Sequence, residues 1–372
     1  MNLQRLPIET IEAILNYTTK NDQLSLCTSS KLLYDLAIRL LYRDLTFTCS
    51  SRLVQCFRVL KSKQGHAMAV TELTIATDSA MQHLRAYFRL IKDVLARLGG
   101  LRCLNIDHPF ETHSDILDHC VFPRLNILTL GLFEGRYTPK FLSRHSNITL
   151  LQIFTPQKIY NHPTGGLSSL CFPNLRHYLG RTALFPSWLS RSTLLETLIL
   201  KYDYAHPTTN KTFEFLSNTP AERLHLIFSG WNLEGCRVVS KTLPALKAVR
   251  FINTGFITED VVKASQFIEH FGEFLPIFSH LEEISIIEST LSHLTPSALD
   301  REHERVQEWR STCPELKMCE FDAGVIWTLK GNPEHPTWEP AARNVSMSGD
   351  IIHQWQVKRA VAEVQEISRK LK

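Results

Sequence analysis

Apolar residues recur along most of the chain in one spacing, apolar-x-x-apolar-x-apolar. Successive copies begin between 20 and 35 residues apart, and several open alike, as FPRL, FPNL, LPAL and CPEL. In an extended strand, alternate side chains share a face, so the closely spaced pair in each copy predicts a short strand with one buried face. The copies are Val70/Leu73/Ile75, Leu101/Leu104/Ile106, Leu125/Leu128/Leu130, Ile148/Leu151/Ile153, a weak one at Leu175/Tyr178, Leu195/Leu198/Leu200, Ala221/Leu224/Leu226, Leu246/Val249/Phe251, Leu281/Ile284/Ile286 and Leu316/Cys319/Phe321.

Stretches with helical spacing separate several of these strands, notably residues 80–98 and 259–274. A strand, a return helix and the next parallel strand form one coil of a solenoid, in which no coil buries its apolar face alone. We therefore expect an α/β fold in which stacked coils form a curved rod, with a parallel sheet inside and helices outside. A two-layer α/β domain with a flat sheet is the alternative, and the even recurrence argues against it.

The repeat resembles the leucine-rich repeat family in its helix-containing form. That family has a polar residue three positions after the last apolar residue of each strand. In this sequence the agreement is incomplete, so the resemblance supports the architecture more strongly than the number of repeats. Asp78, Asp203, Ser229, Thr254 and Ser289 fit this position, whereas Pro109, Phe133, Pro156 and Gly324 do not.

The first 45 residues have the pattern of three short helices. We expect Pro7 to be the first residue of the first helix, because its ring fixes φ and its missing N–H would be unpaired there. Glu9 then lies in the first turn, where the helix dipole favours an anion. One apolar stripe follows, made of Ile8, Ile11, Ile14 and Leu15.

Polar residues precede the other two expected helices. Asn21 or Asp22 can cap the second helix, and Ser29 or Ser30 the third. Three helices in about 45 residues fall near the size at which one core cannot stabilise a domain alone. The apolar stripe of the first helix therefore needs the rest of the chain or an outside partner.

This segment resembles an F-box, through Leu6-Pro7-x-Glu9, the Ile14-Leu15 pair and the closing LLYRDL of residues 40–45, which is similar to a segment of fungal F-box proteins. The resemblance implies docking on the Skp-type adaptor of a cullin-based SCF ubiquitin ligase. Thr18, Ser29-Ser30 and Leu33 depart from the family, which usually has leucine, valine–cysteine and an aromatic residue there. The residues that match adaptor-binding positions are Leu6, Pro7, Ile11, Ile14, Leu15 and Leu24.

The repeat pattern stops at Gly331. GNPEHPTWEP holds three prolines without a period and predicts an extended loop. A helix over residues 351–371 should follow, with Asp350 as its cap. This helix either caps the last coil or covers the inner groove as a mobile element. The expected domains are residues 1–45, 46–330 and 331–372.

Composition narrows the classes of protein. The chain has 372 residues, is 44% hydrophobic and has a net charge of +4, which predicts a globular protein with neither nucleic acid nor a membrane as partner. No signal peptide or membrane-length apolar run is visible, so we expect a cytoplasmic or nuclear protein. Nine scattered cysteines predict buried free thiols, including Cys27, Cys103, Cys171 and Cys319.

No motif for catalysis or cofactor binding is present, so we expect no enzyme activity and no cofactor. His108, His113, His119 and Cys120 lie close together, but their spacing matches no zinc site and predicts ordinary loop residues. The acidic residues Asp300, Glu302, Glu304 and Glu308 alternate with arginines on one predicted helix. A solvated face with intrahelical ion pairs explains them better than a catalytic pair.

A binding surface is expected on the inner face of the sheet, where side chains alternate with the core residues. Ile227, Ile252 and Ile287 should form an apolar row across three neighbouring strands, with His225 and Arg250 as basic neighbours. Phe154 has the corresponding position on an earlier strand. The row suits peptide docking, although β-branched residues also favour strands for conformational reasons, and a loop or the last helix would hide it.

An adaptor-binding module joined to a large binding surface is the arrangement of a substrate receptor. The sequence therefore predicts the substrate-recognition subunit of an SCF-type ubiquitin ligase, with an unidentified protein as its target. The alternative is a leucine-rich-repeat scaffold without a ligase, in which the N-terminal helices only cap the repeats. An α/β hydrolase or transferase is a third reading, without a motif to support it.

Overall fold

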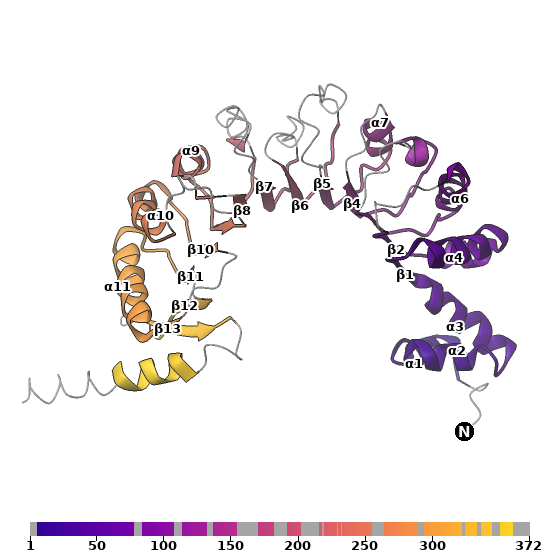
Figure 1. Ribbon diagram of the computed structural model, residues 1–372, viewed down its shortest axis with the longest axis horizontal. Coiled ribbons are helices and arrows are strands. Elements are labelled where there is room, and N and C mark those ends of the chain that lie inside the picture. The colour runs from indigo at the N-terminus through magenta and orange to yellow at the C-terminus, as the bar shows by residue number, and fades with distance from the viewer. Residues whose placement is uncertain are drawn as a thin grey trace, which may run out of the picture. The chain divides into compact units, whose positions relative to one another are not determined.

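The computed structural model describes residues 6–77, 84–107, 114–131, 137–154, 170–181, 192–201, 216–217, 219–228, 230–231, 233–254, 264–288, 294–321, 324–332, 336–343 and 350–359. The chain is mixed α/β and divides into two compact units, Met1–Gly180 with Pro186–Leu194, and Arg181–Phe185 with Leu195–Lys372. Figure 1 labels the elements of both units.

The first unit begins with a three-helix bundle and continues into a parallel sheet. The bundle consists of α1 (Ile8–Asn16), α2 (Lys20–Leu26) and α3 (Lys31–Arg43). The remaining elements are β1 (Asp44–Phe47), α4 (Ser50–Ser62), α5 (Gln64–Ala69), β2 (Glu72–Ile75), α6 (Arg85–Leu95), β3 (Cys103–Ile106), the 3-10 helix η2 (Ser114–Leu117), β4 (Ile127–Gly131), α7 (Tyr137–Ser143), β5 (Leu150–Phe154) and β6 (His177–Arg181).

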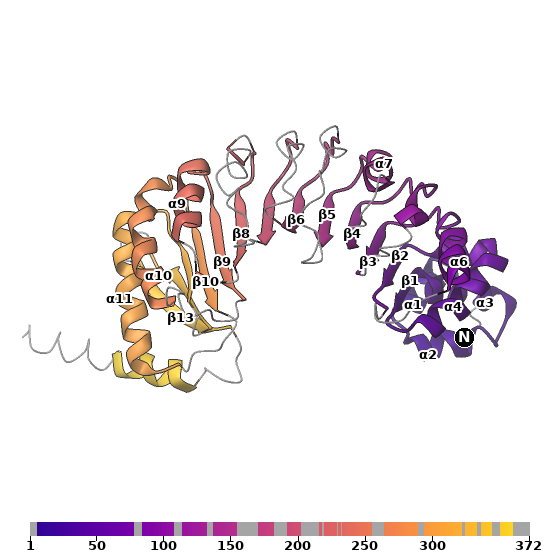
Figure 2. The same cartoon turned by 45° about the horizontal axis from the view of Figure 1, so that its top comes forward.

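The expected strands of this unit are present, and the apolar repeat sets their register. Neighbouring strands follow one another in chain order and are parallel, so that Leu73, Leu104, Leu128, Leu151 and Tyr178 pair in one row. These five side chains are all buried. Helices α4, α6 and α7 cover one face of the sheet (Figure 2).

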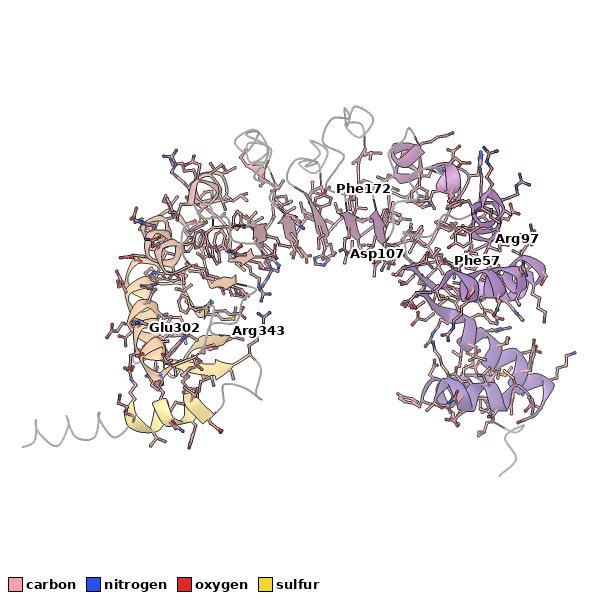
Figure 3. The ribbon with its side chains drawn as sticks, in the orientation of Figure 1. Phe57, Arg97, Asp107, Phe172, Glu302 and Arg343 are labelled. Carbon is pink, nitrogen blue, oxygen red and sulfur yellow. The ribbon has the colours of Figure 1, made fainter. Side chains whose placement is uncertain are left out.

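Side chains on the helical face of this sheet form the core of the first unit. Phe57 of α4 is fully buried and packs edge-on against Phe47 of β1, with ring centroids 5.8 Å apart. Phe172, between β5 and β6, is also buried. Asp107, directly after β3, is exposed on the opposite side of the strands (Figure 3).

The second unit repeats this arrangement and ends differently. Its elements are β7 (Thr197–Lys201), β8 (Arg223–Phe228), α9 (Leu233–Thr242), β9 (Ala248–Asn253), α10 (Ala264–Phe271), the 3-10 helix η5 (Gly272–Ile277), β10 (Glu283–Glu288), α11 (Pro296–Thr312), β11 (Met318–Phe321), β12 (Val325–Lys330) and β13 (Thr337–Ala342). Residues 350–359 form a further helix.

Strands β7 to β11 are parallel and in chain order, with the expected apolar residues in register and buried. Helices α9, α10 and α11 cover one face of this sheet (Figure 2), and no helix of the described ranges covers the other. Thr254 occupies the polar repeat position, and its hydroxyl donates to the carbonyl of Phe228 at the end of β8 at 3.0 Å. The other polar repeat positions, from Asp78 to Ser289, lie outside the described residues.

The chain end differs from the prediction of a loop. Residues 337–342 form β13, which pairs antiparallel with β12, and β12 pairs antiparallel with β11. Pro340 is tolerated because β13 is an edge strand, where a missing N–H breaks no internal ladder. The last helix already includes residue 350, so Asp350 is helical and not its cap. Residues 360–372 lie outside the described part, and the predicted end of this helix at residue 371 falls among them.

Both return helices end before the predicted residue. Helix α6 covers only part of the predicted 80–98, and residues 259–274 contain α10 followed by the start of η5. The predicted boundary at residue 45 lies inside β1, because α3 runs directly into this strand. The bundle and the first strands are therefore one compact unit.

Two helix starts in the bundle also need correction. Pro7 has an extended ψ of 145° and is the N-cap of α1, so the helix begins at Ile8. Helix α2 begins at Lys20, before the expected caps, and Thr19 caps it. The Thr19 hydroxyl accepts from the Asp22 N–H, and the Asp22 carboxylate accepts from the Thr19 N–H, which is a capping box. Ser30 caps α3 as one of the two expected residues.

Candidate functional site

The N-terminal bundle has a closed core of its own. Ile11 and Leu15 of α1 pack against Leu36 of α3, and all three are buried. Gln23 is buried beside them, and its side-chain amide donates to the carbonyl of Leu15 at 3.0 Å. Four partly buried leucines surround this core: Leu6, Leu26, Leu33 and Leu40.

Several large apolar side chains of the bundle remain outside this core. In the described residues, eleven large hydrophobic side chains are exposed, and five of them lie in the first 32 residues. Ile8 is 50% exposed, Ile14 46% and Leu24 56%. Tyr17 and Leu32 complete the group. We call Pro7, Ile8, Ile14 and Leu24 the bundle surface.

The structure separates the six predicted adaptor-binding residues into two groups. Pro7, Ile14 and Leu24 are exposed, whereas Ile11 and Leu15 are part of the core and Leu6 packs against it. In the free chain, Ile11 and Leu15 therefore hold α1 on α3 and are not accessible to a partner. Ile8 is accessible, although it matches none of the predicted positions.

The second unit contains the predicted apolar row. Strand pairing places Ile227 of β8 beside Ile252 of β9, and Ile252 beside Ile287 of β10. All three are partly exposed, on the sheet face that no described helix covers. Lys201 of β7 continues the row next to Ile227. For Phe154, the structure describes the backbone at the end of β5 but not the side chain.

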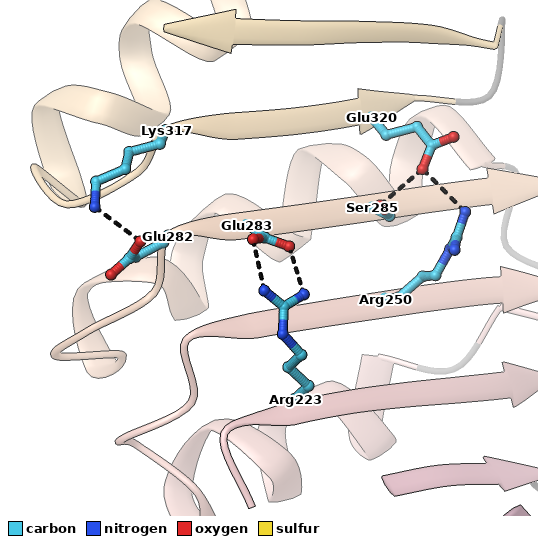
Figure 4. Close-up of polar contacts among 7 residues, drawn as sticks. All are labelled: Arg223, Arg250, Glu282, Glu283, Ser285, Lys317 and Glu320. Atoms are coloured by element: carbon cyan, nitrogen blue, oxygen red, sulfur yellow. Dashed lines mark hydrogen bonds and ion pairs between the residues drawn. The ribbon is translucent and has the colours of Figure 1, made fainter. Parts of the chain in front are cut away.

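Arg250, a predicted basic neighbour of this row, is not a free cation. Its Nη2 lies 3.1 Å from Oε2 of Glu320, which is on β11, two strands away. The hydroxyl of Ser285, on the intervening β10, donates to the same carboxylate oxygen at 2.8 Å (Figure 4). Glu320 is buried, so burial makes this pairing strong and its loss costly.

Glu320 has a second cationic neighbour. Nη1 of Arg343, directly after β13, lies 3.0 Å from Oε1 of Glu320. This contact has the distance of an ion pair but not the geometry of a hydrogen bond, since Oε1 accepts none. The buried carboxylate of Glu320 on β11 thus contacts side chains from β9, from β10 and from the residue after β13.

His225, the other predicted basic neighbour, is neutral at neutral pH. Burial, and then the nearby cations Arg250 and Arg223, lower the pKa of its imidazole below the usual value. Arg223 itself forms two hydrogen bonds of 2.8 Å with the carboxylate of Glu283, two strands away (Figure 4). Arg250 and His225 therefore do not supply the free positive charge that the sequence predicts, whereas Lys201 of β7 is a cationic neighbour of Ile227.

Charged side chains also alternate where the strands begin. Lys247 pairs with Glu222 at 2.6 Å, and Lys317 pairs with Glu282 at 2.8 Å. These pairs are exposed and contribute little to stability. They show that both positive and negative side chains lie where the strands of the second unit begin.

The candidates for other chemistry are dispersed in the described ranges, where no three metal-ligating side chains come together. His119 is exposed and Cys120 buried, while His108 and His113 lie outside the described residues. All nine cysteines are described, and none is in a disulfide. Cys49 and Cys171 are exposed, however, so the prediction of burial fails for both. No described helix is both long and apolar enough to cross a bilayer.

The acidic residues of α11 have a role that the sequence reading missed. The Asp300 carboxylate accepts a hydrogen bond from Nε1 of Trp355 at 2.7 Å, and the Glu302 carboxylate accepts one from Nε1 of Trp327 at 2.8 Å. These two side chains therefore anchor buried indoles. The sequence gives little indication of these contacts, because the tryptophans lie 25 and 55 residues after the carboxylates that accept from them.

A cavity of about 610 Å³ lies beside these contacts, and the sequence gives no hint of it. We call it the C-terminal cavity. Helix α11, strand β13 and the last helix line it, through residues that are far apart in the sequence. Its lining includes Arg310, Trp338, Pro340, Trp355 and Arg359.

A comparison of the chain with models of known protein families finds no match, and a comparison with curated proteins finds none either.

Proposed function

We propose that the chain is the substrate-recognition subunit of an SCF-type ubiquitin ligase. The N-terminal bundle, as an F-box, would bind a Skp-type adaptor and through it a cullin, and the repeats, as a leucine-rich-repeat solenoid, would bind a protein target. The receptor transfers no group and needs no cofactor. It acts by proximity, because tethering raises the effective concentration of target lysines near the ubiquitin-charged enzyme.

The observation that carries this proposal is the bundle surface. A bundle with its own closed core has no need of further apolar contacts, yet it exposes Ile8, Ile14 and Leu24 at about half of their area. Exposed apolar groups of this density are typical of a protein–protein contact. Ile8 directly follows Pro7, which agrees with the resemblance of this segment to an F-box.

The apolar row of Ile227, Ile252 and Ile287 supports the second half of the proposal. These side chains are partly exposed on adjacent strands, and the nearby arginines Arg250 and Arg223 are already paired with carboxylates. A target segment with apolar side chains could lie across them without leaving a buried charge unpaired. The target itself is defined only as a protein with such a segment.

A repeat scaffold without ligase activity is the second candidate. It is favoured by the direct connection of α3 to β1 and by the stacking of Tyr42 on His66, with ring centroids 4.8 Å apart. The first joins the bundle to the sheet and the second joins α3 to α5, as a structural cap requires. The exposed apolar side chains of the bundle are the feature that a cap does not explain.

Co-expression with the Skp-type adaptor and the cullin of the same organism separates the two candidates. The full chain should be used, because removal of residues 1–45 would also remove the start of β1 and uncover β2. We expect the three proteins to purify together as a stoichiometric complex. A folded chain that purifies without adaptor would contradict the ligase proposal and leave the scaffold.

A further inference from the structure

We propose that the apolar row binds an amphipathic α-helix, with apolar side chains at positions i, i+3 and i+7 and an acidic side chain at i+10. The inference rests on the proposed function for the role of this helix as part of the target, and it names the chemistry by which the row would recognise that target. Three features support it: the spacing of the isoleucines, a cation at one end of the row and the paired charges along one side.

The spacing of the row fits a helix better than an extended segment. The row crosses the strands, because Ile227, Ile252 and Ile287 are direct partners on β8, β9 and β10. Neighbouring strands lie about 4.8 Å apart, so the second and third isoleucines lie about 5 and 10 Å from the first. Along a helix axis, positions i+3 and i+7 lie about 4.5 and 10.5 Å from position i. Alternate residues of an extended segment lie about 6.7 Å apart, so the third of them would miss the third isoleucine by about 4 Å.

A cation lies at the β7 end of the row. Lys201 is the strand partner of Ile227 and is partly exposed. The nearby Arg223 and Arg250 are paired with carboxylates, whereas no ion pair of the described residues includes Lys201. Three strand spacings separate Lys201 from Ile287, which is about 14 Å, and position i+10 of a helix lies about 15 Å from position i. An acidic side chain at i+10 would therefore reach the Lys201 ammonium, and the negative end of the helix dipole would lie on the same side.

The polar groups along one side of the row offer no further free charge. His225, Arg250 and Ser285 lie two residues before the three isoleucines on the same strands. Arg250 and Ser285 both contact the carboxylate of Glu320 (Figure 4), and the lowered pKa of His225 leaves its imidazole neutral at neutral pH. A second charge on this flank of the helix would lose water without gaining a partner. The row therefore favours a helix with a single acidic position beside its apolar stripe.

The test uses the full chain and a fluorescein-labelled, alanine-based peptide of about 16 residues, held helical by a lactam bridge on its opposite face. The peptide has leucines at i, i+3 and i+7 and a glutamate at i+10, and a second peptide has lysine in place of the glutamate. Fluorescence anisotropy at low salt measures the dissociation constants. We expect the glutamate peptide to bind saturably and the lysine peptide about tenfold more weakly, because like charges repel. Lys201→Glu should reverse this preference.

Two control variants make the result specific. Ile252→Asp should abolish binding of both peptides, whereas Ile277→Asp should not, because Ile277 is 38% exposed but belongs to η5 and not to the row. Lys241→Glu reverses an exposed charge on α9 and should leave the preference for the glutamate peptide unchanged. Circular dichroism checks that each variant is folded.

Adaptor binding is measured separately, by the co-expression described above. No saturable binding of the glutamate peptide, equal affinities for the two peptides, or an unchanged preference in Lys201→Glu would overturn the inference, even if the adaptor still purifies with the chain. Charge-dependent peptide binding by a chain that purifies without adaptor would contradict the ligase proposal and support the helix as the ligand of a scaffold.

Discussion

Glu320 is a buried carboxylate that two arginines and a serine hold in place. Replacement by alanine would leave the guanidinium of Arg250 half-buried without its partner. We expect Glu320→Ala to lower the free energy of unfolding by about 3 kcal/mol, because an uncompensated charge in the sheet is costly. Urea denaturation of the full chain, followed by circular dichroism, measures this loss.

The matched control is Glu222→Ala, which removes an exposed ion pair with Lys247 of similar length. Solvent screens this pair, so its removal should change the unfolding midpoint little. Equal losses in both variants would show that burial does not determine the strength of the Glu320 contacts.

His145 should make stability depend on pH. Its Nε2 accepts from the Phe122 N–H at 2.9 Å, and its Nδ1 contacts the Phe141 carbonyl at 2.7 Å, so the neutral ring with hydrogen on Nδ1 fits both. Burial lowers the pKa of this imidazole. Below the usual histidine pKa of about 6.5, the unfolded chain therefore takes up a proton that the folded chain resists.

The free energy of unfolding should consequently fall as the pH drops from about 7 to about 5. In a His145→Gln variant, part of this decline should disappear, because glutamine does not titrate. The measurement is a series of urea titrations across this pH range for both proteins. The same decline in the variant would contradict the role of His145.

Some residue contacts follow from the sequence and others do not. The row of Ile227, Ile252 and Ile287 could be predicted, because the apolar repeat fixes the register of neighbouring strands. The pair of Arg250 and Glu320 could not, because it skips the strand between them and joins residues 70 positions apart. A repeat pattern specifies neighbours, but long side chains reach farther.

At the scale of elements, each strand that carried the apolar pair of the repeat was found. Strands β1, β12 and β13 lacked the full pattern. Leu45 of β1 was assigned to the end of the helical segment, and Pro340 in β13 argued against a strand. Strands β1 and β13 each lie at an end of the strand order, where pairing on one side suffices and the sequence constraint is weaker.

Gly100 marks a close approach of the segment before β3 to the end of α5. A Cβ atom at this position would lie 2.5 Å from the carbonyl oxygen of Met68 and 3.2 Å from that of Val70. Both atoms are backbone, so the chain itself would have to move. We expect Gly100→Ala to destabilise the protein by about 2 kcal/mol, as measured by thermal or urea unfolding.

Gly65 of α5 provides the comparison, because no atom lies within 4 Å of the Cβ position there. Gly65→Ala should be neutral or stabilise the protein by up to about 1 kcal/mol, since alanine favours the helix. A Gly100 variant as stable as this one would show that the segment before β3 adapts freely.

For the whole molecule, the apolar residues of the first helix serve two purposes. Ile11 and Leu15 close the bundle, whereas Ile8 and Ile14 flank them and stay exposed. The sequence pattern could not separate these groups, because all four residues have helical spacing. Only the position of α3 decides which side chains are covered.

The most direct measurement is a calorimetric titration of the purified Skp-type adaptor into the full chain and into an Ile8→Asp, Ile14→Asp, Leu24→Asp variant. Val121→Asp serves as the control, because Val121 is 54% exposed and lies outside the bundle. We predict that wild type and control bind alike, and that the triple variant, folded by circular dichroism, binds at least about 100-fold more weakly. Unchanged affinity of the triple variant, or no binding by the wild type, would contradict the proposed adaptor site.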